Sequence, residues 1–365
     1  MALSKITNAS VADTAVHGRR RININGAMTV AQRGTSKTGV TTTGYYATDR
    51  MRFGIGSCGT WTVSQDSNAP NGFANSHKIL CTTAAPASLS ASANLIGVDM
   101  KLEAQDLQQL GYGTSDAKDM TLSFWVKSNK TGTASISPLQ SDNSNKMLSV
   151  TYTIDAADTW EYKTVHIPAD TSGVINDDNG QGMEFHFWLN SGSNYTGGSS
   201  KTTWSTFGQT HRNAANLGLG SAVNDYWQIT GLQLEVGEAS PFEHRSYGEE
   251  LLACQRYLYA AVPTDAPAGS GVVNASQYSS SAYFYGYFPF PTTMRSSPTL
   301  SYSGAGDFKT RFGNSPVTTS VGTQGAFTNQ GGSLAFGGGT SSGAGYSGWV
   351  ETSNTNAYIF FDAEL

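Results

Sequence analysis

Aromatic side chains recur on one face of several predicted strands, where they could stack against sugar rings. Residues 121–127 alternate with period two and turn Trp125 away from the predicted core. Residues 183–189 alternate in the same way and turn His186 and Trp188 away from the core. Exposed aromatic rings stack on the apolar faces of sugars, and short polar side chains beside them can hydrogen-bond to sugar hydroxyls. The pattern therefore predicts a surface for carbohydrate.

A glycan platform would form if these side chains met on one concave sheet. Tyr162 and His166 share a face of a further predicted strand, at 160–167. The glycan-binding candidates are Trp125, Tyr162, His166, His186 and Trp188. The same face could instead be buried against another domain or subunit, because Trp is highly buried on average. Both interpretations remain open from the sequence.

Motifs of nucleophilic or phosphate-transfer catalysis are missing. The chain lacks a Gly-x-Ser-x-Gly elbow that joins a strand to a helix, a His-Glu-x-x-His pair, and a phosphate-binding loop followed by Lys-Ser/Thr. A glycosidase needs two carboxylates that face each other at a fixed separation. Asp177 and Asp178 are adjacent in a turn sequence and indicate a turn instead. We expect no enzyme, although carboxylates from distant strands could still form a catalytic pair.

The cysteines and histidines show no metal-ligand spacing. The six histidines are too scattered for a zinc motif, and the three cysteines are far apart in the sequence. We expect free, buried thiols at Cys58, Cys81 and Cys254, with a Cys58–Cys81 disulfide as the alternative on counting grounds. No cofactor is expected.

The composition favours an ordered all-β protein. Only 13% of the 365 residues are charged, against about a quarter in an ordinary globular chain, and the formal net charge is −5. The 41 glycines accompany 17 Tyr, 16 Phe and 7 Trp, so the chain is rich in aromatics where a disordered chain would be poor. No apolar run approaches the roughly 20 residues that span a bilayer. The slight acidity argues against nucleic acid as a partner. We expect neither membrane insertion nor nucleic-acid binding.

Turn and strand signals divide the chain into four parts. Residues 1–21 are polar and end in a basic run, which predicts an attachment arm. Amphipathic strands separated by turn sequences fill 22–245 and predict an antiparallel jelly-roll sandwich. A short helix at 249–259 lies in the linking segment 246–262. A second, smaller sandwich-like β domain follows at 263–365.

One strand of the last part is unusually aromatic. Tyr283, Tyr285 and Tyr287 alternate with Phe284, Gly286 and Phe288, so both faces of the strand are apolar. A long aromatic strand on a free edge would aggregate, so we expect this strand to be buried on both sides, as a trimer interface would bury it. We expect the short helix to lie near the threefold axis. The oligomer-interface candidates are Leu251, Leu252, Leu258, Tyr283, Tyr285 and Tyr287.

Several ordered stretches carry a resemblance to a known family. The most specific is Ile-Thr-Gly-Leu-Gln-Leu-Glu-Val-Gly at 229–237, followed by Pro-Phe-Glu at 241–243 and Cys-Gln-Arg-Tyr at 254–257. Shorter matching stretches lie at 22–28, 30–35, 46–51, 122–127 and 294–299. From about residue 20 to about residue 300 the chain resembles bacteriophage tail-fibre and virion structural proteins. Residues 301–365 lie outside the resemblance, which would suit a variable, host-facing tip.

The resemblance implies a jelly roll like those of carbohydrate-binding modules, then a fibre-type β domain, usually in a homotrimer. It also implies that a structural calcium ion is possible, with candidate ligands Asp49, Asp99, Asn224 and Asp225. Glu235, Glu238 and Glu243 align with family residues. We expect them to be structural, by pairing with Arg245 or Arg256 or by accepting hydrogen bonds from backbone donors.

These observations lead to three candidate functions. The first is a tail fibre or receptor-binding adhesin of the phage particle that attaches to a host surface glycan, with residues 1–21 bound to other tail or capsid proteins. The second is a non-adhesive structural fibre or adaptor on the capsid, neck or tail. The third is a depolymerase that cleaves the polysaccharide it binds.

Overall fold

A computed structural model describes residues 19–85, 89, 94–277, 283–304, 306–312, 315–324, 327–337 and 345–365. It confirms the expected all-β class, because antiparallel sheets make up both of its compact units. The first unit contains residues 35–247, the segment up to Thr29 and the last residue. The second contains residues 248–364 together with Val30–Gly34.

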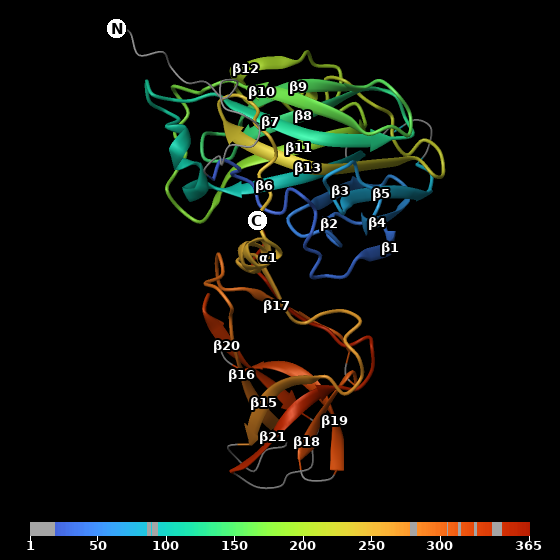
Figure 1. Ribbon diagram of the computed structural model, residues 1–365, viewed down its shortest axis with the longest axis vertical. Helices are drawn as coiled ribbons and strands as arrows, with labels where there is room; N and C mark the ends of the chain where they lie inside the picture. Colours follow the sequence, from blue (N-terminus) through green and yellow to red (C-terminus); the bar gives the residue numbers. More distant parts are fainter. Residues whose placement is uncertain are drawn as a thin grey trace. The chain divides into compact units, whose positions relative to one another are not determined.

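The first unit is a sandwich of two antiparallel sheets, drawn from blue to yellow in Figure 1. The six-stranded sheet has the order β1 (Ser36–Val40), β4 (Thr60–Asp66), β5 (Ser76–Thr83), β13 (Tyr226–Val236), β7 (Met120–Ser128), β10 (Glu161–Ile167). The seven-stranded sheet has the order β12 (Lys201–Ser205), β9 (Lys146–Ile154), β8 (Gly132–Gln140), β11 (Gln181–Ser191), β6 (Leu95–Glu103), β3 (Arg52–Gly56), β2 (Gly44–Tyr45). Two short 3-10 helices, η2 (Ala104–Leu110) and η3 (Gln209–His211), lie in connections.

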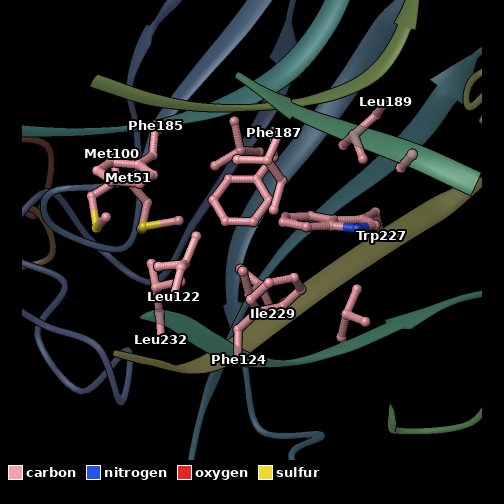
Figure 2. Packing of buried hydrophobic residues seen from close by; sticks show 14 of the residues in the cluster. Met51, Met100, Leu122, Phe124, Phe185, Phe187, Leu189, Trp227, Ile229 and Leu232 are labelled. Carbon is pink, nitrogen blue, oxygen red and sulfur yellow. The ribbon is translucent and has the colours of Figure 1, made fainter. Parts of the chain in front are cut away.

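The core between these sheets comes from the alternating apolar residues. Phe124 of β7 and Phe187 of β11 meet edge to face, with ring centroids 5.4 Å apart, and Trp227 of β13 lies beside Phe187 (Figure 2). Edge-to-face contact matches the positive edge of one ring to the negative face of the other. The predicted inward faces of β7 and β11 are therefore confirmed.

The three cysteines are free and buried, as expected. Burial raises the pKa of the Cys58 thiol to about 11, because a thiolate is poorly solvated there. Burial, with the nearby charge of Asp225, also raises the pKa of Cys81 to about 11.

The second unit holds a small sheet and a closed barrel, drawn in orange and red in Figure 1. The helix α1 (Tyr247–Gln255) precedes the sheet, whose order is β14 (Leu258–Val262), β22 (Ile359–Asp362), β17 (Thr299–Tyr302). The barrel has the order β15 (Gly271–Gln277), β16 (Tyr283–Pro289), β20 (Gly331–Gly337), β19 (Ser315–Gln324), β18 (Phe308–Phe312), β21 (Tyr346–Thr352). Among the described residues, no helix is both long enough and apolar enough to cross a bilayer.

Several predicted boundaries need correction. The helix ends at Gln255, and Leu258 is a fully buried residue of β14, so it cannot line a helix at a threefold axis. The second unit begins near residue 248, since α1 and β14 belong to it, so the boundary predicted at 263 falls inside this unit. Its main element is a closed barrel and not a sandwich, because β15 pairs with both β16 and β21.

The segment Val30–Gly34 was expected in the jelly roll but belongs to the second unit. The Gln32 side chain donates to the Leu258 carbonyl oxygen at 2.7 Å, and the Arg33 guanidinium lies 2.6 Å from the Asp362 carboxylate. The polar alternation of residues 30–35 does not reveal these partners, which are more than 200 residues away.

The predicted arm is shorter than residues 1–21. Residues 1–18 lie outside the described part of the chain, but Arg21 is buried in the first unit. Its backbone amide donates to the Glu243 carboxylate at 2.9 Å, and the Arg20 amide donates to the same oxygen. Residues 20 and 21 are therefore part of the folded unit.

Candidate functional site

A strip of aromatic side chains runs across the outer face of the six-stranded sheet. We call it the Trp125 strip and define it by Trp160, Tyr162, Trp125, Phe73, Phe242 and His244. At its centre, Trp125 of β7 and Tyr162 of β10 are register partners, with ring centroids 5.5 Å apart. Tyr162 is 46% exposed and Trp125 is half-buried. Two neighbouring rings thus share one open face of the sheet.

A bulge at Gly231 in β13 leaves room for the next ring of the strip, Phe73. The register of β13 against β7 shifts between Thr230 and Gln233, and Gly231 in this bulge has φ of +60°. A Cβ at Gly231 would lie 2.7 Å from Phe73 Cζ and 3.0 Å from Trp125 Cδ1. Glycine therefore provides both the left-handed backbone and the room in which the two rings lie.

Phe242 and His244 extend the strip beyond Phe73. Phe73 meets Phe242 edge to face at 4.9 Å, and His244 lies 4.8 Å from Phe242 between centroids. The Arg21 guanidinium lies 5.2 Å from the Phe242 ring centroid, within the range of a cation–π contact. Burial and the Arg21 charge lower the pKa of His244. His244 is consequently an aromatic, neutral member of the strip at neutral pH.

Polar groups border the other end of the strip. The Asn68 side-chain oxygen accepts hydrogen bonds from Trp160 Nε1 at 3.0 Å and from Lys127 Nζ at 3.3 Å. Lys127 lies on the same face of β7 as Trp125, two residues further along. The rings are therefore flanked by an amide and an ammonium group that can serve a polar ligand.

His166 shares the outer face of β10 with Tyr162 but lies two alternations away. Its Nε2 is 3.1 Å from the Asp119 carboxylate, and both side chains are exposed. The hydrogen bond from the Ala169 amide, and then the contact with His166, lower the pKa of Asp119. His166 is thus hydrogen-bonded to Asp119 at the surface beside the strip.

The prediction that His186 and Trp188 join Trp125 on one platform is wrong. Both residues lie on β11, in the seven-stranded sheet, whereas Trp125 lies in the six-stranded sheet. Trp188 is fully buried and donates from Nε1 to Ser137 Oγ at 2.7 Å. The following segment covers it, because the Arg212 guanidinium lies 4.8 Å from its ring centroid. Neither residue presents a ring face to solvent.

His186 instead belongs to a buried cluster with Asp99 and Glu184. One ligand atom from each of the three residues lies within 4.8 Å of the others, a separation that could suit a metal ion. However, Arg52 lies 2.6 Å from Asp99, Arg212 lies 3.1 Å from Glu184, and His186 Nδ1 contacts Asp99. Since protein cations already neutralise both carboxylates, we assign an ion-pair network here.

The pKa values of this cluster follow from the same charges. Burial alone would raise the pKa of Asp99, but the charges and hydrogen bonds of His186 and Arg52 outweigh it and hold the pKa at about 2. Burial would lower the pKa of His186, and Asp99 outweighs it, so the net direction is upward. The pair is therefore an aspartate and an imidazolium over a broad acidic range.

The candidate calcium ligands come from different elements of the first unit. Asp99 lies on β6 in the seven-stranded sheet, whereas Asp225 directly precedes β13 of the six-stranded sheet. Asp225 accepts hydrogen bonds from the Gly220 and Ala222 amides and lies 3.4 Å from Lys130 Nζ. Asp49 and Asn224 also lie far apart along the chain, before β3 and beside Asp225. Asp99 and Asp225 thus already have protein partners, and calcium binding by any of the four candidates stays a prediction.

Two of the family-matched glutamates have the structural roles expected of them. Glu235 is fully buried and accepts hydrogen bonds from the Ser240 amide at 2.8 Å and the Ser240 hydroxyl at 2.6 Å. Glu243 accepts from the amides of Arg20 and Arg21 and pairs with Arg245 at 3.0 Å. These carboxylates organise backbone and are not free for catalysis.

The interface candidates of the second unit are largely exposed in the single chain. Tyr283 is 47% exposed and Tyr287 is 57% exposed, while Tyr285 is half-buried. The strand is therefore buried on only one side, because the tyrosines point out of the barrel and the phenylalanines point in. On α1, Leu252 is 48% exposed and Leu251 is half-buried.

The sequence alone did not single out four members of the strip: Phe73, Trp160, Phe242 and His244. It also did not single out the flanking Asn68 and Lys127 as binding residues. Phe242 lies in the Pro-Phe-Glu stretch at 241–243, which pointed to a structural role for Glu243 and not to a ring at the surface. Phe73 and Asn68 lie in a turn-rich connection after β4, where period-two alternation does not apply.

Comparisons with known proteins give fold likenesses only. No protein-family model and no curated protein matches the chain. Among solved structures, the enzymatically active domain of bacteriophage CBA120 tailspike protein 4 aligns with 59% of this chain at 12% identity and a TM-score of 0.30. A putative sugar binding protein from Bacteroides thetaiotaomicron aligns over 60% of this chain and 100% of its own, at 11% identity and a TM-score of 0.33.

A third likeness is the CBM22-1 xylan-binding domain from Paenibacillus barcinonensis Xyn10C, over 58% of this chain and 99% of that domain, at 8% identity and a TM-score of 0.28. The alignment with the tailspike covers 22% of that protein's length. In these three likenesses the identity is at most 12% and the TM-score at most 0.33.

Proposed function

We propose that this protein binds a glycan through the Trp125 strip. The observation that carries the proposal is the neighbouring pair Trp125 and Tyr162, whose rings lie 5.5 Å apart on an open sheet face with Tyr162 46% exposed. A contiguous row of aromatic rings on an open sheet face indicates a binding surface, because monomers rarely expose large contiguous apolar patches. The flanking Asn68 and Lys127 groups make the surface suited to a polar ligand.

The rings and their neighbours suit the two sides of a sugar. The axial C–H groups of a pyranose pack on aromatic faces, and its hydroxyls need donors and acceptors at the rim. Because the two central rings, Trp125 and Tyr162, come from strands held by ladder hydrogen bonds, little of their side-chain freedom is lost on binding. Binding by a preformed surface also requires no catalytic step, and we assign none.

The wider role that we propose is that of a phage tail-fibre adhesin on the virion surface. Its supports are the resemblance of residues 229–237, 241–243 and 254–257 to tail-fibre proteins, and the strip as a surface for a host glycan. Residues 1–19 would contact other tail or capsid proteins, and a homotrimer would multiply weak glycan contacts into useful avidity. Sedimentation of the full chain at about three times its mass of 38.7 kDa would support the trimer.

The test is binding of the full-length protein to an array of bacterial surface polysaccharides and lipopolysaccharides. Trp125→Ala and Tyr162→Ala should each lower the affinity for the bound glycan at least about tenfold, the loss expected for a central contact residue. Phe207→Ala, at an aromatic residue that is 38% exposed outside the strip, is the matched control. Unchanged glycan binding by both strip variants would overturn the proposal, and reducing-end release from the bound glycan would reveal cleavage.

A further inference from the structure

A second aromatic surface lies on the outside of the barrel and is separate from the Trp125 strip. Three of its rings are well exposed: Tyr283 at 47%, Tyr287 at 57% and Trp349 at 47%. Strand β16 places Phe284 and Phe288 in the barrel core, so its alternate residues must point outward. We call this surface the barrel face.

Glycines in the neighbouring strand let the tyrosine rings lie across the barrel wall. Tyr287 pairs with Ser333 of β20, and Tyr283 pairs with Gly337. A Cβ at Gly331 would collide with the Tyr287 hydroxyl oxygen, and a Cβ at Gly337 would collide with the Tyr283 ring. Since the rings cover these glycines, they rest on the wall and present their faces to solvent.

Small polar residues of β15 lie between the tyrosines of β16 and Trp349 of β21. Ser276 of β15 pairs with Tyr285 of β16 and with Ser347 of β21, and all three strands are adjacent in the barrel. Two residues along, Asn274 pairs with Trp349. The same register places Asn274 beside Tyr287 as well. The rings of Tyr287 and Trp349 therefore lie on the two strands that flank β15, two strand spacings apart, or roughly 10 Å. A short oligosaccharide can reach across that distance.

One edge of the barrel face carries a net positive charge. Trp349 Nε1 donates to Glu351 Oε2 at 3.3 Å, and Arg311 Nε donates to the same oxygen at 2.7 Å. Lys309 Nζ lies 3.9 Å from the other oxygen of Glu351. These two cations face one carboxylate, so the group beside Trp349 has a surplus positive charge that favours an acidic ligand.

The composition of the barrel face favours an external ligand over a second copy of the chain. Permanent subunit interfaces are more hydrophobic than the rest of the surface, and Ser is depleted in them. The described outward positions around the rings include Asn274, Ser276, Ser333 and Ser347. Tyr and Trp set among Ser, Asn and Gly is the mixture that binding sites use, because rigid rings give contact area and short polar groups adapt.

We propose that the barrel face is a second carbohydrate site, which binds an oligosaccharide that carries a carboxylate or phosphate group. Sugar rings stack on Tyr287 and Trp349, Asn274 and Ser276 hydrogen-bond to hydroxyls between them, and the acidic group lies toward Arg311 and Lys309. This site uses none of the residues of the Trp125 strip, so either site can exist without the other.

The experiment compares full-length variants on four probes: polygalacturonate and a phosphate-bearing teichoic acid as acidic polymers, and dextran and laminarin as neutral ones. Binding is measured by retardation in native gels that contain the polymer. The variants are the double substitution Tyr287→Ala with Trp349→Ala, the charge variant Lys309→Gln, and the control Tyr302→Ala at a tyrosine of β17 that is 40% exposed. The strip variant Trp125→Ala is run beside them.

We expect at least one acidic polymer to retard the native protein. The double variant should bind this polymer about tenfold or more weakly, and Lys309→Gln should also bind it more weakly. Tyr302→Ala and Trp125→Ala should bind it as the native protein does. A comparison of the two acidic polymers identifies carboxylate or phosphate as the preferred group. If only Trp125→Ala lost binding to the acidic polymers, the second site would be overturned and the proposed function would stand. Retardation by neutral polymers alone, or by none, would also overturn it. A smaller sedimenting species for the double variant would show that the face joins copies of the chain.

Discussion

His186 lies directly against the backbone of Gly97, one strand away in the seven-stranded sheet. A Cβ at Gly97 would occupy the place of His186 Nε2 and would lie 2.6 Å from the Phe187 carbonyl oxygen. The missing side chain therefore lets the imidazole fold back over β6, where its Nδ1 contacts Asp99. Glycine at this position is a condition for the buried ion-pair network.

Gly97→Ala should therefore destabilise the first unit. The imidazole would have to leave, and Asp99 would lose one of its two cationic partners in a buried place, at a cost of about 2–4 kcal/mol. Urea unfolding followed by tryptophan fluorescence measures the change, because six of the seven tryptophans lie in this unit. Gly271→Ala is the control, since a Cβ there meets nothing within 4 Å. Equal unfolding free energies for Gly97→Ala and Gly271→Ala would contradict the requirement for glycine beside His186.

Period-two alternation was enough to predict which residues of a strand face the core. It placed Phe124 and Phe187 inward correctly, and Trp125 and Tyr162 outward on what proved to be adjacent strands. Alternation does not say to which sheet a strand belongs or what covers its outer face. Trp188 was misjudged for this reason, because Arg212 and Tyr195 of the next connection pack over it.

Long-range closure was the second feature that the sequence could not reveal. The barrel depends on pairing between β15 and β21, and the order of strands along the chain does not specify it. The placement of Arg33 beside Asp362 likewise joins residues at opposite ends of the chain. Local patterns determine the faces of elements, whereas these contacts depend on which distant elements pair in the folded chain.

Gly231→Ala should weaken glycan binding without removing any ring. The added methyl group would displace Phe73 and Trp125, which come within 2.7 Å and 3.0 Å of its position. Gly237→Ala is a matched control in the residue after the same strand, because Gly237 also has a positive φ, +80°, but open space around its Cβ position. We expect the affinity for the array glycan to fall several-fold more for Gly231→Ala.

Both substitutions impose similar backbone strain, on the order of 1 kcal/mol. The difference between them isolates ring displacement, provided that circular dichroism shows both variants folded. Equal affinities would mean that the seating of Phe73 and Trp125 is irrelevant to binding, and that the ligand lies elsewhere on the protein.

Glu243→Ala should release residues 20 and 21 from the first unit. Its carboxylate accepts hydrogen bonds from the Arg20 and Arg21 amides. Hydrogen exchange at these two amides should accelerate at least about tenfold, because each loses an acceptor worth more than 1 kcal/mol. Glu238→Ala, at an exposed glutamate five residues earlier, is the control. Unchanged protection in Glu243→Ala would show that other contacts hold this segment.

His77 should make the first unit sensitive to acid. It lies on β5, paired with Gln65 and Ile229, and is fully buried; in the described part of the chain neither ring nitrogen has a hydrogen-bond partner. Burial lowers the pKa of His77 to about 3. The unfolded chain takes up a proton at His77 below about pH 6.5, whereas the folded chain does so only near pH 3. Stability contributed by the neutral form is therefore lost as the pH falls from 6.5 toward 3.

His77→Leu and His77→Gln separate this proton effect from the cost of burying a polar group. Both variants lack the titrating imidazole, so their free energy of unfolding should fall less than that of the native chain between pH 7 and pH 4.5, by about 2–3 kcal/mol. Only the leucine variant should also gain stability at pH 7, since glutamine keeps an amide in the apolar site. All other titratable groups are the same in the three proteins. The difference in how their free energy of unfolding changes with pH therefore reports on His77 alone. Parallel pH curves for the three proteins would mean that the imidazole finds a proton-sharing partner in the folded state.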